Sequence, residues 1–487
     1  MGNYIGYQQD NQVEPATSSN TTAEEKLPSS PKKRKRDVDD LSSDEDSNIP
    51  ATPRKKMKTT SEYIYNTLFV SGENSDVTIQ ALDHDWKLHV LYLCQSPYFR
   101  SMFLQDWQEK GESLISITIP DPWINIKALD IAFGSLYSYE VDSDLLMENL
   151  IPVLAASRMF QLDGLLQHCE DSMVETICSD NVCKYHDAAT RYDLVVVKER
   201  CFSWLERNML LCRTSVLVKD LSETLLESLL SSNNFVVMQV EMDIYNFLKL
   251  WLYLQIHRDC NSELKELVIK TQKYFYAQKD SNSKSFLESE LGLNYANIFQ
   301  SLRLQNMITD AKCIRLIEKD GLIPKAWLLP LYEKQWRTML AVYSGSDQGP
   351  SEVDEDDFHK YSFRCGRMLE ADNRYCWRWT GFSYGIDMIL TYNNRTRTLC
   401  AKRNTFSQPC NFAICLQSQR QVAMKFKAFT LTSSGQEALV KDTDIMQWNF
   451  RTDEEIPLLT LDEDWTFPVY ISARMLLASF TTDSLDC

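Results

Sequence analysis

Cysteine and histidine are the side chains here that could bind a metal or act as nucleophiles, so their spacing decides what chemistry is open. The 487 residues include 14 cysteines and six histidines. A structural zinc needs paired, closely spaced ligands, but Cys178 with Cys183 and Cys410 with Cys415 are isolated pairs, and no C-x-x-C occurs. The phosphate-loop, dinucleotide, nucleophile-elbow and H-E-x-x-H motifs are also absent. We therefore expect no metal site, no cofactor and no catalytic residue.

Charge and composition indicate a protein that binds other proteins. The formal net charge is −17, whereas direct nucleic-acid binding needs a basic face. At 44% apolar residues, a chain of this length has room for about three domains. Scattered cysteines and no signal-peptide core predict a reducing compartment. The most apolar stretch, 244–256, is interrupted by Lys249 and Gln255 and is too short to span a bilayer. We expect no transmembrane segment.

Residues 1–60 differ from the rest of the chain. They are rich in Ser, Thr, Pro, Asn and charge, and we expect them to be disordered because they cannot bury enough apolar area. Two basic blocks in this tail have the character of nuclear import signals. A solvated charge run in a flexible tail is the alternative. The basic residues are Lys32, Lys33, Arg34, Lys35 and Arg36 in the first block and Arg54, Lys55, Lys56 and Lys58 in the second.

Several residues of the tail are candidates for modification. Ser30 and Thr52 stand before the basic blocks in Ser/Thr-Pro-basic-Lys patterns, which proline-directed cell-cycle kinases favour. A phosphate adds about −1.5 to −2 charge, so we expect phosphorylation there to weaken nuclear import around cell division. Ser42 and Ser43, in the acidic stretch between the blocks, are further candidates. Gly2 is a candidate for myristoylation and weak membrane association, although position six is glycine rather than Ser or Thr.

Two periodicities alternate after the tail. Apolar residues at every second position over 77–79 and 86–88 predict a β-hairpin. From His89 the apolar spacing becomes helical, with a break at Pro97, because proline supplies no N–H donor. Residues 114–119 alternate again and predict a further strand.

This stretch resembles the core of a BTB/POZ domain, an α/β fold, over about residues 60–172. The likeness implies a homodimer. Tyr63, Ile64, Thr67 and Leu68 have the spacing of a helix that would pack across the dimer interface, and a helix packed on its own chain is the alternative. The motifs that carry the resemblance are Asp76-Val77, His89-Val90-Leu91, Ser96-Pro97-Tyr98-Phe99, Met102-Phe103, Phe133-Gly134-Ser135-Leu136-Tyr137, Leu154-Ala155-Ala156, Leu162-Asp163-Gly164-Leu165 and Cys169.

Trp107 and Glu109 lie just beyond the Met-Phe end of the predicted helix. BTB adaptors that bind the cullin-3 scaffold carry a hydrophobic-x-Glu triplet at this place, so the resemblance implies that these two residues bind cullin-3. A large aromatic ring can anchor in a partner's pocket, and a carboxylate can accept a charge-assisted hydrogen bond. The alternative is a packed tryptophan beside a solvated charge.

Apolar residues keep helical spacing over 178–251, and helical character extends to about Tyr343. The first part is similar to a BACK domain, an all-helical module that usually follows BTB in cullin adaptors and extends toward the substrate. The residues that carry this likeness are Asn181, Ala188, Ala189, Leu194, Leu229, Leu230, Ser231, Ser232, Glu241, Trp251 and Leu252.

The last part of the chain changes to strand-like alternation. Residues 388–392 alternate before an Asn-Asn turn, and residues 422–428 alternate before a turn at 433–435. Two such hairpins predict a compact β-rich domain. No repeat near 50 residues occurs, which excludes a kelch propeller. The aromatic run 375–382 is either core or a ligand platform.

The basic head, BTB, BACK and repeat-free tail together resemble the germ cell-less family, most distinctively at residues 364–367 and in the aromatic run. The resemblance implies a nuclear, nuclear-envelope-associated protein of germ-cell development that acts as a cullin-3 substrate adaptor. Its partners would be cullin-3, a second copy, an unidentified protein substrate and nuclear-envelope proteins. The alternative is a nuclear scaffold or transcriptional-repression partner that uses BTB only to dimerise.

The expected organisation is therefore an α+β multidomain chain. A RING ligase needs closely spaced Cys and His sets, so this chain would be a non-catalytic subunit. The expected parts are a disordered tail (1–60), a BTB domain (61–174), a helical BACK-like region (175–350), an acidic linker (351–360) and a β-rich C-terminal domain (361–487) that binds substrate or partner.

Overall fold

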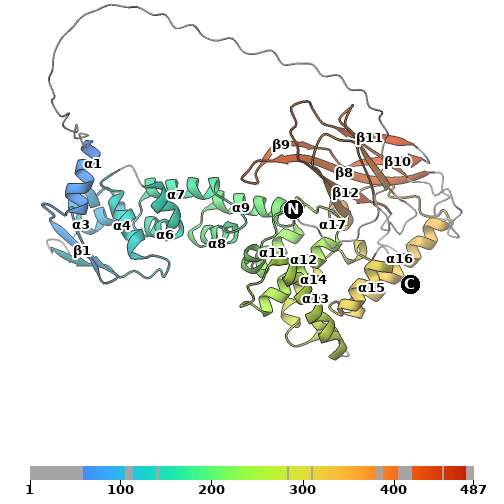
Figure 1. Ribbon diagram of the computed structural model, residues 1–487, viewed down its shortest axis with the longest axis horizontal. Helices are drawn as coiled ribbons and strands as arrows, with labels where there is room; N and C mark the ends of the chain where they lie inside the picture. Colours follow the sequence, from blue (N-terminus) through green and yellow to red (C-terminus); the bar gives the residue numbers. More distant parts are fainter. Residues whose placement is uncertain are drawn as a thin grey trace, which may run out of the picture. The chain divides into compact units, whose positions relative to one another are not determined.

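The computed structural model describes residues 59–104, 113–138, 142–281, 284–308, 311–379, 388–403, 419–451 and 454–478. Helices and one small sheet occupy the first part of this range, and strands dominate from residue 363 onward (Figure 1). This is the α+β multidomain layout that the sequence predicts.

The first sheet is built from the predicted hairpin and one further strand. β1 (Val77–Ala81) pairs antiparallel with β2 (His84–Leu88) and parallel with β3 (Leu114–Ser116), in the order β2-β1-β3. A two-residue turn, Leu82 and Asp83, joins β1 to β2, and both residues have positive φ, as a type I′ turn requires. The observed β3 ends at Ser116 and is therefore shorter than the strand predicted over residues 114–119.

Short helices surround this sheet. Pro97 begins α3, because its missing N–H is not needed in a first turn, and the Asn125 side chain caps α4 by accepting the Ala128 N–H at 2.8 Å. The rings of Phe99, Phe133 and Phe160 lie 5.2 to 6.1 Å apart and are fully buried. The helices are α1 (Thr60–Ile64), the π-helical η1 (Tyr65–Val70), α2 (Val90–Leu93), α3 (Pro97–Leu104), α4 (Ile126–Gly134), α5 (Ser143–Glu148), α6 (Leu150–Met159) and α7 (Asp163–Glu175).

A stack of helices follows and shares one continuous core with the first part. α12 is almost entirely buried, and its Lys249 and Tyr245 both donate to the same Asp320 oxygen at 2.8 Å. The stack ends at Tyr343, as predicted. Its elements are α8 (Val182–Tyr192), α9 (Val195–Asn208), α10 (Ser215–Asp220), α11 (Glu223–Ser231), α12 (Met242–Ile256), α13 (Leu264–Ser281), η2 (Phe286–Glu288), η3 (Leu293–Tyr295), α14 (Ala296–Gln300), η4 (Leu304–Asn306), α15 (Ala311–Asp320) and α16 (Lys325–Tyr343).

The segment expected to be an acidic linker, 351–360, differs from that expectation. It contains α17 (Glu355–Tyr361), whose Phe358 is fully buried against Ala423 and Leu476. The acidic residues stand in the first turn, where negative charge stabilises a helix through its macrodipole.

The last part is a β-sandwich. One sheet has the order β10-β8-β12-β4, with β9 also paired to β8, and the other has the order β11-β7-β6-β5. Buried residues of both sheets form one cluster, so the sheets face each other across a shared core. The strands are β4 (Phe363–Leu369), β5 (Tyr375–Trp379), β6 (Met388–Asn393), β7 (Thr398–Arg403), β8 (Gln419–Leu431), β9 (Glu437–Asp442), β10 (Met446–Arg451), β11 (Glu455–Thr460) and β12 (Val469–Leu476).

A buried ion pair joins the sandwich to the helices. The Arg364 guanidinium on β4 donates from Nε and Nη2 to the two carboxylate oxygens of Glu241, at 2.7 and 3.0 Å. Both side chains are buried. Arg474 of β12 donates nearby to the carbonyl of Asn233. These contacts connect residues more than 100 positions apart in the sequence.

A second contact joins the β8–β9 turn to α9. Trp204 Nε1 donates to the Ser434 carbonyl at 3.0 Å, and Asn208 Nδ2 donates to the Gly435 carbonyl at 2.9 Å. Gly435 has φ +79°, and a Cβ there would lie 2.6 Å from the Trp204 nitrogen. Only glycine fits this turn, which the sequence predicts at the same place.

Candidate functional site

The residues predicted to bind partners lie outside the described part of the chain. Trp107 and Glu109 fall in the gap between residues 104 and 113. The tail residues Gly2, Ser30, Lys32, Lys33, Arg34, Lys35, Arg36, Ser42, Ser43, Thr52, Arg54, Lys55, Lys56 and Lys58 all precede residue 59.

The elements on either side of Trp107 and Glu109 are well anchored. On one side, Phe99 and Met102 of α3 are buried. On the other, the Thr78 N–H donates to the Ser113 carbonyl at 2.8 Å, and Ile115 of β3 is buried. The predicted contact pair therefore belongs to a connection whose two ends are fixed to the same core.

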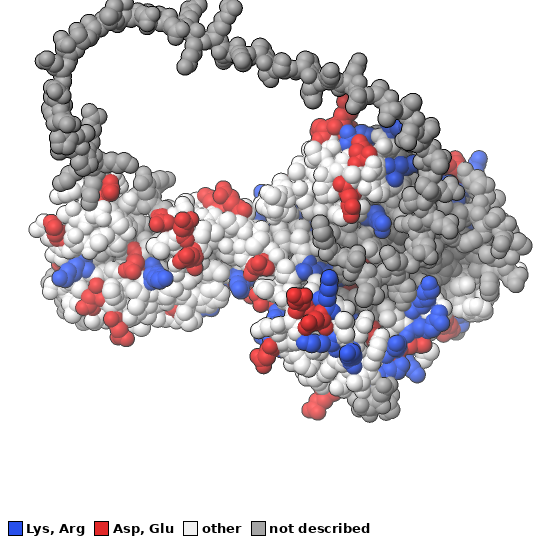
Figure 2. All heavy atoms as spheres, in the orientation of Figure 1, with Lys and Arg blue, Asp and Glu red and all other residues white. Residues whose placement is uncertain are grey.

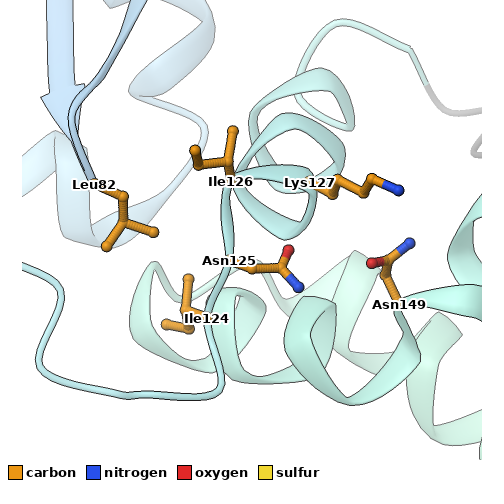
Figure 3. Close-up of a pocket in the computed structure, with 6 residues that line it drawn as sticks. All are labelled: Leu82, Ile124, Asn125, Ile126, Lys127 and Asn149. Atoms are coloured by element: carbon orange, nitrogen blue, oxygen red, sulfur yellow. The ribbon is translucent and has the colours of Figure 1, made fainter.

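A shallow hollow lies on the surface of the same domain (Figure 3). Leu82 reaches it from the β1–β2 turn, the segment entering α4 supplies one wall, and Asn149 comes from the start of α6. Leu82 and Ile126 are exposed, whereas Ile124 is buried. The lining residues are Leu82, Ile124, Asn125, Ile126, Lys127 and Asn149.

The lining of the hollow is mostly uncharged, and its two amides are engaged within the chain. The Asn125 side chain is engaged in capping α4, and Asn149 Nδ2 donates to the Leu145 carbonyl at 3.1 Å. Lys127 is the one titratable side chain among the six lining residues. Within the described ranges, no cluster of three or more His, Cys, Asp or Glu could hold a metal ion. The hollow is therefore suited to apolar side chains of a partner.

Leu82 lines the hollow, a position that the sequence pattern does not indicate. A leucine with φ +48° is unusual, because its Cβ crowds the backbone in the left-handed region. This leucine is also exposed, as are Leu145 and Met147 of α5, which leads into Asn149. The sequence predicts the hairpin turn at Asp83-His84-Asp85, but the structure places it at Leu82 and Asp83, with His84 and Asp85 in β2. An apolar residue directly before that polar run was the signal available in the sequence.

The segment formed by α1 and η1 packs on its own domain through one face. Phe69 lies 5.4 Å from the Tyr137 ring. A Cβ at Gly134 would come within 3.1 to 3.2 Å of Phe69 and Tyr65, so this helix approaches α4 closely. The Tyr137 hydroxyl accepts the His89 N–H at 2.9 Å, and burial raises the pKa of Tyr137.

The opposite face of the α1–η1 segment is left uncovered. No residue of α1 or η1 is buried, and Tyr63 and Val70 are 60% and 64% exposed. Ile64 and Leu68 contact the core, as a helix packed on its own chain would require, but Tyr63 does not. The π-helical turn from Tyr65 onward changes the register of the apolar face.

The aromatic run 375–382 contributes to the core where it is described. Trp377 is buried in the cluster between the two sheets, whereas Cys376 is exposed. The side chain of Trp379 and residues 380–382 lie outside the described part. No helix in the described ranges combines the length and hydropathy needed to cross a bilayer.

Comparisons with known proteins find a domain model for the first part of the chain and relatives that match most of its length. The BTB/POZ domain family model matches residues 65–177. Mouse germ cell-less protein-like 1 is 42% identical over 441 residues, which cover 90% of this chain and 83% of that protein. The human protein of the same name is also 42% identical, with 90% and 84% covered. Protein germ cell-less of Drosophila melanogaster is 33% identical over 473 residues, with 92% and 82% covered.

Proposed function

The chain belongs to the germ cell-less family, and we propose that it is a substrate-recognition adaptor of a cullin-3 RING ubiquitin ligase in germ-cell development. The observation that carries the proposal is the BTB domain itself, which exposes apolar residues around a hollow without catalytic chemistry. The domain would bind the scaffold, and the scaffold would supply the catalytic RING partner.

Trp107 and Glu109 are the proposed cullin-3 contacts. They lie on the connection between α3 and β3, whose ends are fixed by buried residues and by the Thr78 to Ser113 hydrogen bond. The support for this role is their place just beyond the Met102-Phe103 end of α3, where BTB adaptors that bind cullin-3 carry a hydrophobic-x-Glu triplet. The indole would fill an apolar pocket on the cullin, and the carboxylate would set the register.

The uncovered face of α1 and η1 is the proposed homodimer interface. Exposed Tyr63 and Val70 stand on a segment whose other face already packs on the domain. Covering these apolar side chains with a second copy would remove them from water. A dimer would present two scaffold sites and two substrate sites.

The helical stack and the β-sandwich are the proposed substrate arm. The Arg364–Glu241 pair and the docked β8–β9 turn hold the sandwich on the helices. Substrate bound to the C-terminal part would then be carried at a set distance from the scaffold.

We propose that the basic blocks of the tail direct the protein to the nucleus, where nuclear-envelope proteins are partners, and that Gly2 is a site for weak lipid attachment.

Co-purification of cullin-3 with the full chain tests the proposal. Wild type should retain cullin-3, and Trp107→Ala combined with Glu109→Lys should lose it while keeping the dimer. Val440→Ala, at an isolated exposed apolar residue on β9, is the matched control and should retain the scaffold. Absence of cullin-3 from the wild-type sample, with the dimer intact, would favour a nuclear scaffold or repression partner instead.

A further inference from the structure

Helix α16 has an unusual exposed face. Leu328 and Val342 are buried on its inner side, and Gln335 Nε2 donates to the Gln305 carbonyl at 2.8 Å. Surface helices normally turn polar residues outward, but here four large apolar residues are exposed beside the charged Lys325, Glu333, Lys334 and Arg337. The four apolar residues are Leu329 at 62%, Trp336 at 58%, Leu340 at 49% and Tyr343 at 57% exposure.

These four residues, the α16 stripe, line up along the helix. Their separations of seven, four and three residues bring them within one narrow strip at 3.6 residues per turn. The stripe is about 21 Å long at 1.5 Å per residue. Half-buried Tyr332 and Met339 lie beside it at the alternate heptad positions. Such spacing is what a second helix needs to pack alongside.

The surroundings of the α16 stripe are basic. Residues 311–343 hold six basic and three acidic residues, although the whole chain carries −17. Two of the acids are already engaged, because Asp320 is buried with Lys249 and Glu333 pairs with Arg337. Setting the Glu333–Arg337 pair and Asp320 aside, the segment keeps five basic residues and one acid, Glu318. Figure 2 shows lysines and arginines gathered over the surface where Figure 1 places α15 and α16. The basic residues are Lys312, Arg315, Lys319, Lys325, Lys334 and Arg337, all exposed.

We propose that the α16 stripe binds an amphipathic helix of a partner protein, with apolar residues at three- and four-residue spacing and acidic residues on its flanks. An exposed apolar strip with a central tryptophan is typical of such grooves and hot spots. Charge complementarity selects the partner. A second copy is disfavoured, because it would bring two basic surfaces together. The proposal goes beyond the ligase role and does not depend on cullin-3.

A designed peptide tests this surface directly. The probe is a fluorescent helical peptide of about 21 residues with leucine at heptad a and d positions and glutamate on the flanks, spanning the stripe. Fluorescence anisotropy with the full chain, without cullin-3, should show saturable binding. A scrambled peptide of the same composition should not bind. Trp336→Asp should weaken binding by roughly tenfold or more, and Arg315→Glu should weaken it less and reduce its salt dependence.

The control variant is Val440→Asp, because Val440 is an isolated exposed apolar residue on β9; it should bind as wild type does. Equal binding by Trp336→Asp and wild type, or equal binding of the ordered and scrambled peptides, would overturn the proposal. Two other outcomes would also overturn it. A change of oligomeric mass with Trp336→Asp would assign the α16 stripe to a second copy of the chain. Peptide binding seen only after residues 1–58 are removed would assign the α16 stripe to the chain's own tail.

Discussion

Buried cysteines give this protein a measurable residue-scale property. Cys169, Cys183 and Cys201 are at most 4% exposed, and burial raises the pKa of each thiol from 9.0 to about 12. Between these values the folded protein holds protons that the unfolded chain has lost. Since stability rises with pH only where the unfolded state binds more protons, it must fall here.

We therefore expect the free energy of unfolding to decrease as pH rises from 9 toward 12, by at most about 1.4 kcal/mol per pH unit for each thiol. Urea unfolding at several alkaline pH values measures this slope. Cys201→Ala should flatten it, whereas Cys376→Ala, at an exposed position, should leave it unchanged. Identical slopes in all three proteins would contradict the assignment.

At the scale of elements, the contact between helices and sandwich depends on three arginines around one carboxylate. Burial, with the neighbouring Arg364, lowers the pKa of Arg303 to about 9 and that of Arg474 to about 10. Arg303 and Arg474 therefore still carry their charge at neutral pH. Glu241 is thus the counter-charge that these arginines share, and Asp442 and Glu206 add negative charge near Arg474.

Glu241→Gln should destabilise the protein by about 3–5 kcal/mol, because it leaves buried cations without their partner. Thermal unfolding and hydrogen exchange of β4 and β12 measure the effect. Asp462→Asn is the matched control. That carboxylate pairs with Lys441 at 3.2 Å within the sandwich and is exposed, so its loss should cost about 1 kcal/mol or less. Equal effects of the two substitutions would refute a special role for the buried cluster.

The exposed face of the α1–η1 segment allows a separate test of the proposed homodimer. Tyr63→Glu should convert the proposed dimer to a monomer without unfolding it, because the side chain is exposed in the single chain and a buried interface charge is unfavourable. Light scattering should report a mass near 56.6 kDa instead of twice that value. Val440→Glu is the control and should remain dimeric. A Tyr63→Glu protein of unchanged dimer mass would place the interface elsewhere.

Local pattern was sufficient for most elements but not for contacts between them. The β1–β2 and β6–β7 hairpins follow from alternation at every second residue, and the end of α16 follows from helical spacing. α17 was missed because its run of acids resembled a linker and one phenylalanine, Phe358, carries its burial. The Arg364–Glu241 pair spans 123 positions, a distance at which periodicity carries no information. The predicted contacts Trp107 and Glu109 stay predictions.

At the scale of the whole chain, the N-terminal tail differs in net charge from the rest of the sequence. Residues 1–60 hold ten basic and ten acidic residues, so the rest of the chain carries the entire excess of −17. The negative charge of a phosphate beside a basic block would weaken the binding of that block to an acidic import receptor. Glutamate at both Ser30 and Thr52 should lower the nuclear fraction, and alanine at both should keep it high through division. Imaging of synchronised cells measures this, and equal nuclear fractions in all forms would remove the proposed regulation.

In the proposed assembly, a BTB dimer binds the cullin-3 scaffold through Trp107 and Glu109. The most direct measurement is size-exclusion chromatography with light scattering of the purified full chain mixed with the BTB-binding part of cullin-3. The prediction is a complex of two chains with two cullin fragments for wild type. Trp107→Ala with Glu109→Lys should give the free dimer, at twice 56.6 kDa, and unbound cullin. A complex of undiminished mass and affinity with the double variant would contradict the claim.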